Sequence, residues 1–187
     1  MEVIDFLDEF FEAEKQIVEN YLKPDLKTYN NSVDNISNYV VDSLKSSFGA
    51  KLSVPMSDSF YERMEKHPPV EKRYLFRIDH YNTEEGDDLY IAYVSNKNPK
   101  GWKAYFDCFI ILPEGSSYKI SAKFNFTDRG TGIKKWYFTG GEQKFLENKN
   151  GERLLNEDSL GERKEIKRLL EPSDDQDSIK EYNKDEI

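Results

Sequence analysis

The feature that most constrains the fold of this chain is a change in the spacing of its apolar residues near Arg73. Before this point the apolar side chains recur every three or four residues, which is the period of an amphipathic helix. After it they alternate with polar side chains, and Tyr and Phe become dense, which is typical of half-buried antiparallel strands. A chain of 187 residues that changes period in this way is predicted to form helices followed by a sheet around one core.

Three helices are predicted before the change of period. The first covers residues 4–22. The second carries apolar residues on one face of the segment 33–48, with Ser32 as its N-cap and Gly49 in the position that ends it. A short third helix follows and must stop before the proline pair at 68–69.

Five strands are predicted after the change of period. The strand at 118–127 alternates most clearly, so we expect one of its faces to be buried and the other solvated. The strand at 103–112 carries apolar side chains on both faces, which predicts a central position covered on both sides. The predicted strands are 74–81, 89–95, 103–112, 118–127 and 133–139.

Beyond Gly141 the composition shifts towards charge. The segment Ser159-Leu-Gly-Glu resembles a capping box and predicts a helix that ends before Pro172. Residues 171–187 hold seven acids and two lysines, a net charge of −5. We therefore predict one α+β domain over 1–141 and a charged, partly helical C-terminal extension over 142–187.

Charge and cysteine content restrict the classes of partner and compartment. The 36 acidic and 27 basic residues give a net charge of −9, which argues against general nucleic-acid binding and against anionic membrane surfaces. A single cysteine, Cys108, excludes an internal disulfide and a cysteine-based zinc site. The acidic start lacks the basic region of a signal peptide, and no apolar run approaches the roughly 18 residues of a membrane span. A soluble, cytoplasmic protein is predicted.

The order of these elements resembles the nuclear transport factor two-like family. Two long strands, 103–112 and 118–127, joined by the tight turn Pro113-Glu-Gly-Ser116, are similar to the paired long strands of that family. The resemblance covers roughly residues 3–139. It implies an α+β, cone-like fold in which N-terminal helices pack on a curved antiparallel sheet, with the helix at 33–48 covering the concave face. The family includes ketosteroid isomerases, scytalone dehydratase and polyketide cyclases, and also bacterial immunity proteins that neutralise toxins.

An enzyme of this shape would hold a general base inside the apolar cone. Asp107 is the best candidate because it lies in the most apolar strand, with Tyr105 or Tyr93 as a hydrogen-bond donor to a developing oxyanion. The alternative is that Asp107 forms an ion pair with Lys103, Arg77 or a lysine across the sheet, or lies at a solvated edge. Enzymatic activity therefore stays an open question, with a non-catalytic role favoured.

No cofactor or metal site is predicted. His67 lies in a linker and His80 at a strand end, which is a poor arrangement for zinc. The acidic turn at 84–88 lacks the ligand spacing of a calcium-binding loop, and no phosphate-binding glycine motif is present. Cys108 has no activating histidine nearby in the sequence, and we expect a buried, inert thiol.

Acidic residues are concentrated in two short segments of the predicted body. One group follows helical spacing near the N-terminus, and the other forms the turn between the first two strands. Such surfaces can steer a basic partner, or can simply form a solvated face. The candidate partner-binding residues are Glu2, Asp5, Glu9, Glu12, Glu84, Glu85, Asp87 and Asp88.

The leading hypothesis is a non-catalytic binding protein, specifically a bacterial immunity protein that neutralises a cognate toxin by direct contact. Its partner would be a basic toxin domain, and the protein itself a monomer or homodimer. The alternative is a small-molecule enzyme or ligand-binding protein, isomerase- or dehydratase-like, that uses the cone pocket. A third possibility is an adaptor whose acidic tail, 171–187, recruits another protein.

Overall fold

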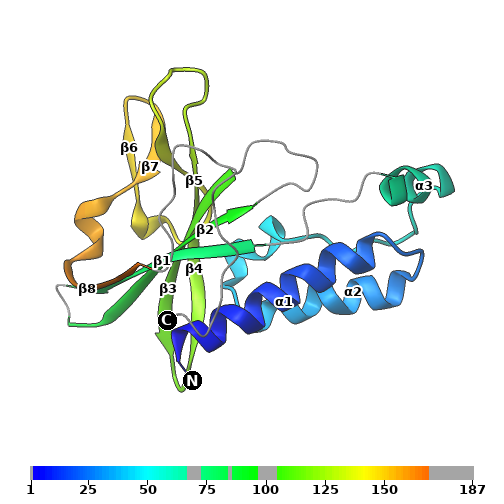
Figure 1. Cartoon of the computed structure of the whole chain (residues 1–187), viewed down its shortest axis with the longest axis horizontal. Coiled ribbons are helices and arrows are strands. Elements are labelled where there is room, and N and C mark those ends of the chain that lie inside the picture. Colours follow the sequence, from blue (N-terminus) through cyan, green and yellow to red (C-terminus); the bar gives the residue numbers. More distant parts are fainter. Residues whose placement is uncertain (1, 67–72, 84–85, 97–104, 169–187) are drawn as a thin grey trace.

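The computed structural model describes residues 2–66, 73–83, 86–96 and 105–168. These residues form an α+β structure in which N-terminal helices lie on one side of a strongly curled antiparallel sheet (Figure 1). The predicted fold class is confirmed.

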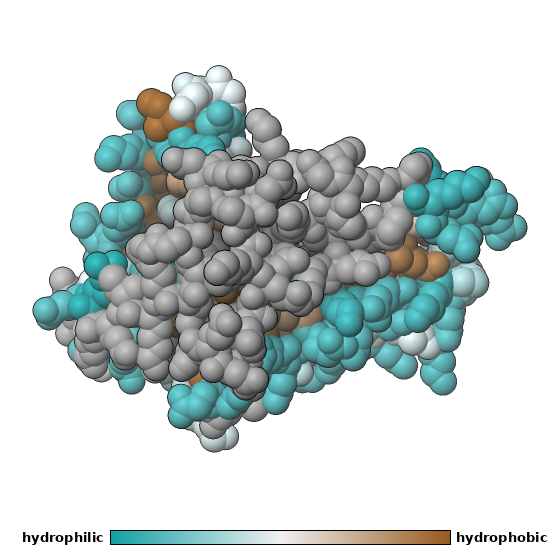
Figure 2. Space-filling view, viewed as in Figure 1, coloured by the Kyte–Doolittle hydropathy of each residue, from teal (hydrophilic) through white to brown (hydrophobic). Residues whose placement is uncertain are grey.

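The first two helices form an antiparallel hairpin (Figure 1). Helix α1, Val3–Tyr21, is present as its apolar spacing predicted, but Ile4 and Phe11 of the expected stripe are only half-buried. Helix α2, Leu26–Asn35, begins at Asp25, whose carboxylate accepts a hydrogen bond of 3.1 Å from the backbone N–H of Thr28. The surface over both helices is mostly hydrophilic (Figure 2). The buried residues of α1 are Phe6, Leu7, Phe10, Ala13 and Ile17.

The prediction of one continuous helix over 33–48 is wrong. Helix α2 ends at Asn35, and two 3-10 helices follow, η1 at Ile36–Asn38 and η2 at Asp42–Ser47. Between η1 and η2 the backbone pairs with Ile120 of β4. The N–H of Ile120 donates to the Tyr39 carbonyl at 2.8 Å, and the carbonyl of Ile120 accepts from the N–H of Val41 at 3.0 Å. This pairing requires extended backbone, so it interrupts the helix while leaving the apolar side chains buried. The third helix, α3 at Asp58–Lys66, is present as predicted.

The described residues form one eight-stranded sheet in which every paired neighbour is antiparallel. Its order is β6-β7-β5-β4-β3-β2-β1-β8, which places β3 in the interior, as predicted. Both faces of β3 are buried, with Cys108 and Ile110 on one and Phe109 and Ile111 on the other. The strands are β1 Arg73–Asn82, β2 Asp88–Asn96, β3 Tyr105–Glu114, β4 Ser117–Thr127, β5 Lys135–Gly141, β6 Leu146–Lys149, β7 Glu152–Leu155 and β8 Glu162–Arg168.

The predicted C-terminal helix is also wrong. Residues Glu157–Leu160 form a 3-10 helix, η4, and the chain then turns at Gly161 into strand β8. The Ser159 hydroxyl donates to the Asn156 carbonyl at 2.6 Å instead of capping a longer helix. Strand β8 pairs with β1 and satisfies backbone groups of β1 that would otherwise form a sheet edge. The described part of the charged segment, with η3 at Gln143–Phe145, therefore continues the same sheet.

The sheet curls because its distant ends are joined by a short connection. In a flat sheet β7 and β8 would lie about 29 Å apart, since neighbouring strands are about 4.8 Å apart. Residues 156–161 span at most about 24 Å when extended, and part of this segment is helical. The curl encloses the apolar cluster formed by Leu89, Ile91, Tyr93, Cys108, Ile110, Ala122, Phe124, Phe138, Phe145, Leu155 and Leu160.

The helices cover the other face of the sheet. Phe6 and Phe10 of α1 and Leu44 of η2 pack there with Phe109 and Ile111 of β3. The rings of Phe10 and Phe109 meet edge to face, with 5.5 Å between their centroids. The segment that follows α2 was expected on the concave face, but it lies on the face opposite the enclosed cluster. The concave side is closed by η3, β7 and η4 instead.

Candidate functional site

Asp107, the predicted general base, is held by three neighbouring side chains. It is 4% exposed, and its Oδ2 accepts from Arg73 Nη1 at 2.7 Å and lies 3.3 Å from Lys123 Nζ. Its other oxygen accepts a hydrogen bond of 3.0 Å from the side-chain amide of Asn125. The alternative of an ion pair across the sheet is therefore the observed arrangement, with Arg73 and Lys123 as the cations.

The electrostatics of Asp107 do not suit a base activated by desolvation. Burial by itself would raise the pKa of this carboxyl, but Lys123, Arg73 and the hydrogen bond from Asn125 together hold the pKa below its usual value. Arg73 also binds Glu14 of α1, with 2.7 Å between Nε and Oε2. Asp107 is thus an ionised member of a network that connects β1, β3, β4 and α1.

The residues proposed to assist Asp107 are not assembled around it. Tyr93 pairs with Cys108 across β2 and β3 and lies in the enclosed cluster, whereas Asp107 shares a face with Phe109 on the helix side. The guanidinium of Arg77 covers the Tyr93 ring at 4.1 Å, and burial raises the pKa of that phenol. The side chain of Tyr105 lies outside the described residues. Asp107 and Tyr93 are on opposite faces of the sheet and cannot act on one substrate atom.

The acidic residues predicted to bind a partner fall into two groups that approach each other. On α1, Glu2, Glu9 and Glu12 are exposed and Asp5 is half-buried. Glu12 lies 3.8 Å from Lys15.

In the turn before β2, Asp87 is exposed, and Asp88 Oδ1 lies 2.8 Å from His80 Nε2. Glu84 and Glu85 lie outside the described residues. Both groups affect the pKa of the Tyr90 phenol. Burial and the neighbouring Tyr118 raise this pKa to about 12, and the negative charges of Asp88 and Glu2 contribute to the increase. Glu2 lines one small hollow together with His80, the partner of Asp88, so the start of α1 and the β1–β2 turn meet at one corner of the molecule.

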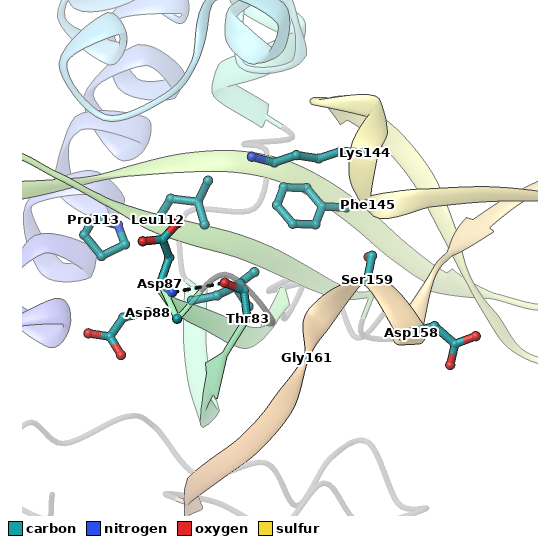
Figure 3. Close-up of a pocket in the computed structure, with 12 residues that line it drawn as sticks. Thr83, Asp87, Asp88, Leu112, Pro113, Lys144, Phe145, Asp158, Ser159 and Gly161 are labelled. Atoms are coloured by element: carbon teal, nitrogen blue, oxygen red, sulfur yellow. Dashed lines mark hydrogen bonds between the residues drawn. The ribbon is translucent and has the colours of Figure 1, made fainter.

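An open groove of about 760 Å³ lies next to the β1–β2 turn, and we call it the acidic groove. It is formed where this turn meets the end of β3, η3 and η4 (Figure 3). Leu89 and Phe145 are buried at its apolar base, and Pro113 is exposed beside them. Its principal lining residues are Asp87, Asp88, Leu112, Pro113, Lys144, Phe145, Asp158 and Ser159.

The polar groups of the acidic groove favour binding of cations over catalysis. The Thr83 hydroxyl accepts a hydrogen bond of 3.1 Å from the backbone N–H of Asp87, and this contact shapes the turn (Figure 3). The Ser159 hydroxyl is likewise bonded within η4. Lys144 lies 3.2 Å from Glu142, so a carboxylate outside the groove already balances its charge. Three carboxylates, those of Asp87, Asp88 and Asp158, thus line the groove. Asp158 also borders a neighbouring hollow lined by Lys134, Lys135 and Lys149.

Within the described ranges, no three His, Cys, Asp or Glu side chains gather in a way that could hold a metal ion. None of the helices that the structure describes combines the length and the apolar character needed to cross a bilayer.

The part of the groove formed by η3 and η4 was missed by the sequence-based prediction, because these elements, like the β6–β7 hairpin between them, belong to the segment expected to be an extension. A signal was present. Asn150 and Gly151 both have positive φ, 53° and 77°, and Asn-Gly is a strong hairpin signal. No protein-family model, curated protein or solved structure matches this chain.

Proposed function

We propose that this chain is a non-catalytic binding protein whose acidic groove docks a basic protein. The specific form that we favour is a bacterial immunity protein that neutralises a cognate toxin by direct binding. One observation carries the proposal: Asp87 and Asp158, far apart in the sequence, are both exposed on the rim of one groove with an apolar base. Lys144, which lines the same groove, is paired with Glu142.

The groove supplies the two components that a protein interface needs. Its carboxylates can pair with lysine and arginine of the partner, and their field can raise the association rate. Leu112 and Pro113 offer apolar surface for a buried anchor. Neutralisation requires no chemistry from this chain, because a protein seated over a toxin's basic active site excludes its substrate.

The enzyme alternative has weaker support. Its candidate base, Asp107, has both carboxylate oxygens engaged by neighbouring side chains. Its candidate donor, Tyr93, lies on the other face of the sheet. We therefore assign Asp107 to the stability of the fold and place the binding function at the acidic groove.

The proposal can be tested with the protein encoded by the adjacent gene, used as the candidate toxin. Co-expression should restore growth when this chain is present, and purified components should bind directly. The double charge reversal Asp87→Lys with Asp158→Lys should weaken binding by about tenfold or more, mainly through the association rate. The matched control is Glu62→Lys with Glu65→Lys, which changes the net charge equally on exposed positions of α3.

The acidic groove includes Gly161, which directly precedes strand β8. Helix α3 lies at the opposite end of the molecule from β8 (Figure 1), so the substitutions at Glu62 and Glu65 do not alter the groove. We expect the control to alter affinity by less than about twofold, since an isolated exposed charge contributes little. Equal losses in both double variants would refute docking at the acidic groove. Direct binding with no protection of growth would refute the immunity function while retaining the binding function.

A further inference from the structure

A second, smaller hollow lies on the helix side of the same corner, and we call it the tyrosine pocket. It has a volume of about 120 Å³. Its lining includes Glu2 and Ile4 from the start of α1, Ile78 and His80 from β1, Tyr90 from β2 and Tyr118 from β4. Four elements that are separate in the sequence therefore build one cavity.

Aromatic rings form much of the wall. Tyr90 and Tyr118 meet at 90°, with 5.7 Å between their ring centroids. The His80 ring stacks flat against Tyr90, at 4.6 Å and an interplanar angle of 8°, and so covers one face of that ring. The faces of tyrosine rings attract cations, and sets of such rings are the usual receptors for them.

Carboxylates stand beside these rings. Glu2 lines the pocket, and it forms no ion pair with any residue that the structure describes. Oδ1 of Asp88 forms a hydrogen bond with His80. The negative charge of Asp88 also contributes to the raised pKa of Tyr90. The same Asp88 lines the acidic groove, so the Asp88–His80 contact links the two hollows.

The size of the pocket limits what can enter. Sites for metabolites occupy about 300–1,000 Å³, whereas 120 Å³ corresponds to the space of about four water molecules. A single side-chain head group fits these dimensions. The combination of ring faces and carboxylate selects a planar cation, because a guanidinium can stack on tyrosine and also bind a carboxylate through two N–H groups.

We infer that the tyrosine pocket receives the guanidinium of one arginine from the basic partner, with Glu2 as its counter-charge and Tyr90 and Tyr118 as its aromatic walls. This inference rests on the proposed function and names the side chain that anchors the partner. In this arrangement the carboxylates of the acidic groove attract the basic partner electrostatically. The neighbouring tyrosine pocket then binds one of its arginine side chains specifically. A desolvated arginine in such a pocket is a common form of interface hot spot.

The test uses the ¹⁵N-labelled full chain and small probes, so it does not require a toxin. Nα-acetyl-L-arginine amide is titrated while backbone amide shifts are recorded by NMR. The citrulline analogue, which has nearly the same shape but no charge, and the lysine analogue are the comparison probes. We expect saturable shifts at His80, Tyr90 and Tyr118 with the arginine probe, affinity about threefold lower with lysine, and no saturation with citrulline.

Variants locate the binding. Tyr118→Leu should reduce affinity for the arginine probe by about fivefold, whereas Tyr118→Phe, which keeps the ring, should retain it. Glu2→Gln lies at an exposed position and should reduce affinity by about threefold without disturbing the fold. Dispersed amide spectra identify the variants that are folded.

Several outcomes would overturn the inference. Equal binding of arginine and citrulline probes would exclude a cation site, and equal binding of lysine would exclude selection of a guanidinium. Shifts that map elsewhere, or that survive both Glu2→Gln and Tyr118→Leu, would exclude this pocket. Because the probes are free amino-acid derivatives, these results stand independently of whether the adjacent-gene product binds the acidic groove.

Discussion

Arg73 and Asp107 form an ion pair that passes over the intervening strand β2, with 2.7 Å between Nη1 and Oδ2. The same guanidinium binds Glu14 of α1, so one arginine connects two non-adjacent strands to the helix layer. The side chains of all three residues are at most 15% exposed. In such surroundings, removal of one charge leaves the others without compensation.

Replacement of Asp107 by asparagine should therefore destabilise the fold. Arg73 would keep only Glu14, and Lys123 would lose its carboxylate partner, so we expect the free energy of unfolding to fall by about 3 kcal/mol. Urea denaturation measures the loss. The control is Asp34→Asn, which breaks an exposed pair with Lys51 and should cost no more than about 1 kcal/mol. Similar losses in the two variants would contradict a structural role for the network.

The same carboxylate should make stability depend on acid pH. Its pKa is lower in the folded protein than in the unfolded chain, so its contribution is complete above the unfolded value of about 3.9. The contribution is lost as the pH falls through the lower, folded value. The stability difference between the wild type and Asp107→Asn should consequently shrink on acidification below about pH 4, as measured by urea midpoints. A constant difference across this range would refute the assignment.

Two glycines with the same backbone angle should respond differently to alanine. Gly161 has a φ of +78°, and a Cβ there would lie 2.3 Å from the Asn82 carbonyl oxygen. Gly151 has a φ of +77°, and a Cβ there would meet nothing within 4 Å. Gly151→Ala should cost about 1 kcal/mol from backbone strain alone. Gly161→Ala should cost substantially more in thermal unfolding, because its ψ of −158° lies in a region open essentially only to glycine and because a Cβ also forces η4 away from β1. Equal costs would contradict the close approach.

Cys108 should be unreactive in the native protein. Its thiol is fully buried, and burial raises its pKa well above the usual value, so almost no thiolate forms near neutral pH. Ellman's reagent should detect no thiol in the folded chain and one thiol per chain in denaturant. Rapid labelling of the native protein would show that the enclosed cluster opens more readily than its packing indicates.

Association with the basic partner should slow as salt is added. We expect the association rate to fall by about tenfold or more between 20 mM and 500 mM NaCl, with a much smaller change in the dissociation rate. Stopped-flow or surface-based kinetics would measure both rates. The variant Asp87→Lys with Asp158→Lys should show a flatter dependence on salt. An association rate that is independent of salt in the wild type would refute acidic steering.

The sequence-based predictions succeeded where local patterns and burial agree. The apolar spacing that begins with Ile4, Leu7 and Phe11 predicted α1, although the face that packs most deeply is centred on Phe6 and Phe10. The two apolar faces of β3 predicted its interior place in the sheet. The predictions failed at 33–48 and 160–168, where helical spacing was outweighed by backbone pairing with β4 and β1. The expectation of a solvated face on the strand at 118–127 is also wrong, because Ser121 is fully buried and both faces of β4 pack against apolar clusters.

The candidate site was predicted only in part, for a related reason. Asp87 and Asp88 were recognised because acids cluster in one turn. Asp158 and Phe145 were not, because their place beside that turn depends on the way residues 156–161 join the two ends of the sheet. Asp107 was correctly identified as unusual, but its partner Arg73 could be found only in three dimensions.

The sequence by itself determined the α+β class, the first helix, the interior place of β3 and the two local concentrations of acid, because periodicity and charge act over a few neighbouring residues. The tertiary structure decided the rest. Only in the tertiary structure is it decided which backbone segments pair and how η4 connects the two ends of the sheet. The same holds for the position of Glu2 at the same corner as Asp88. Ion pairs, aromatic walls and grooves require contacts within a few ångströms between distant parts of the chain, and those contacts form only when the sheet curls.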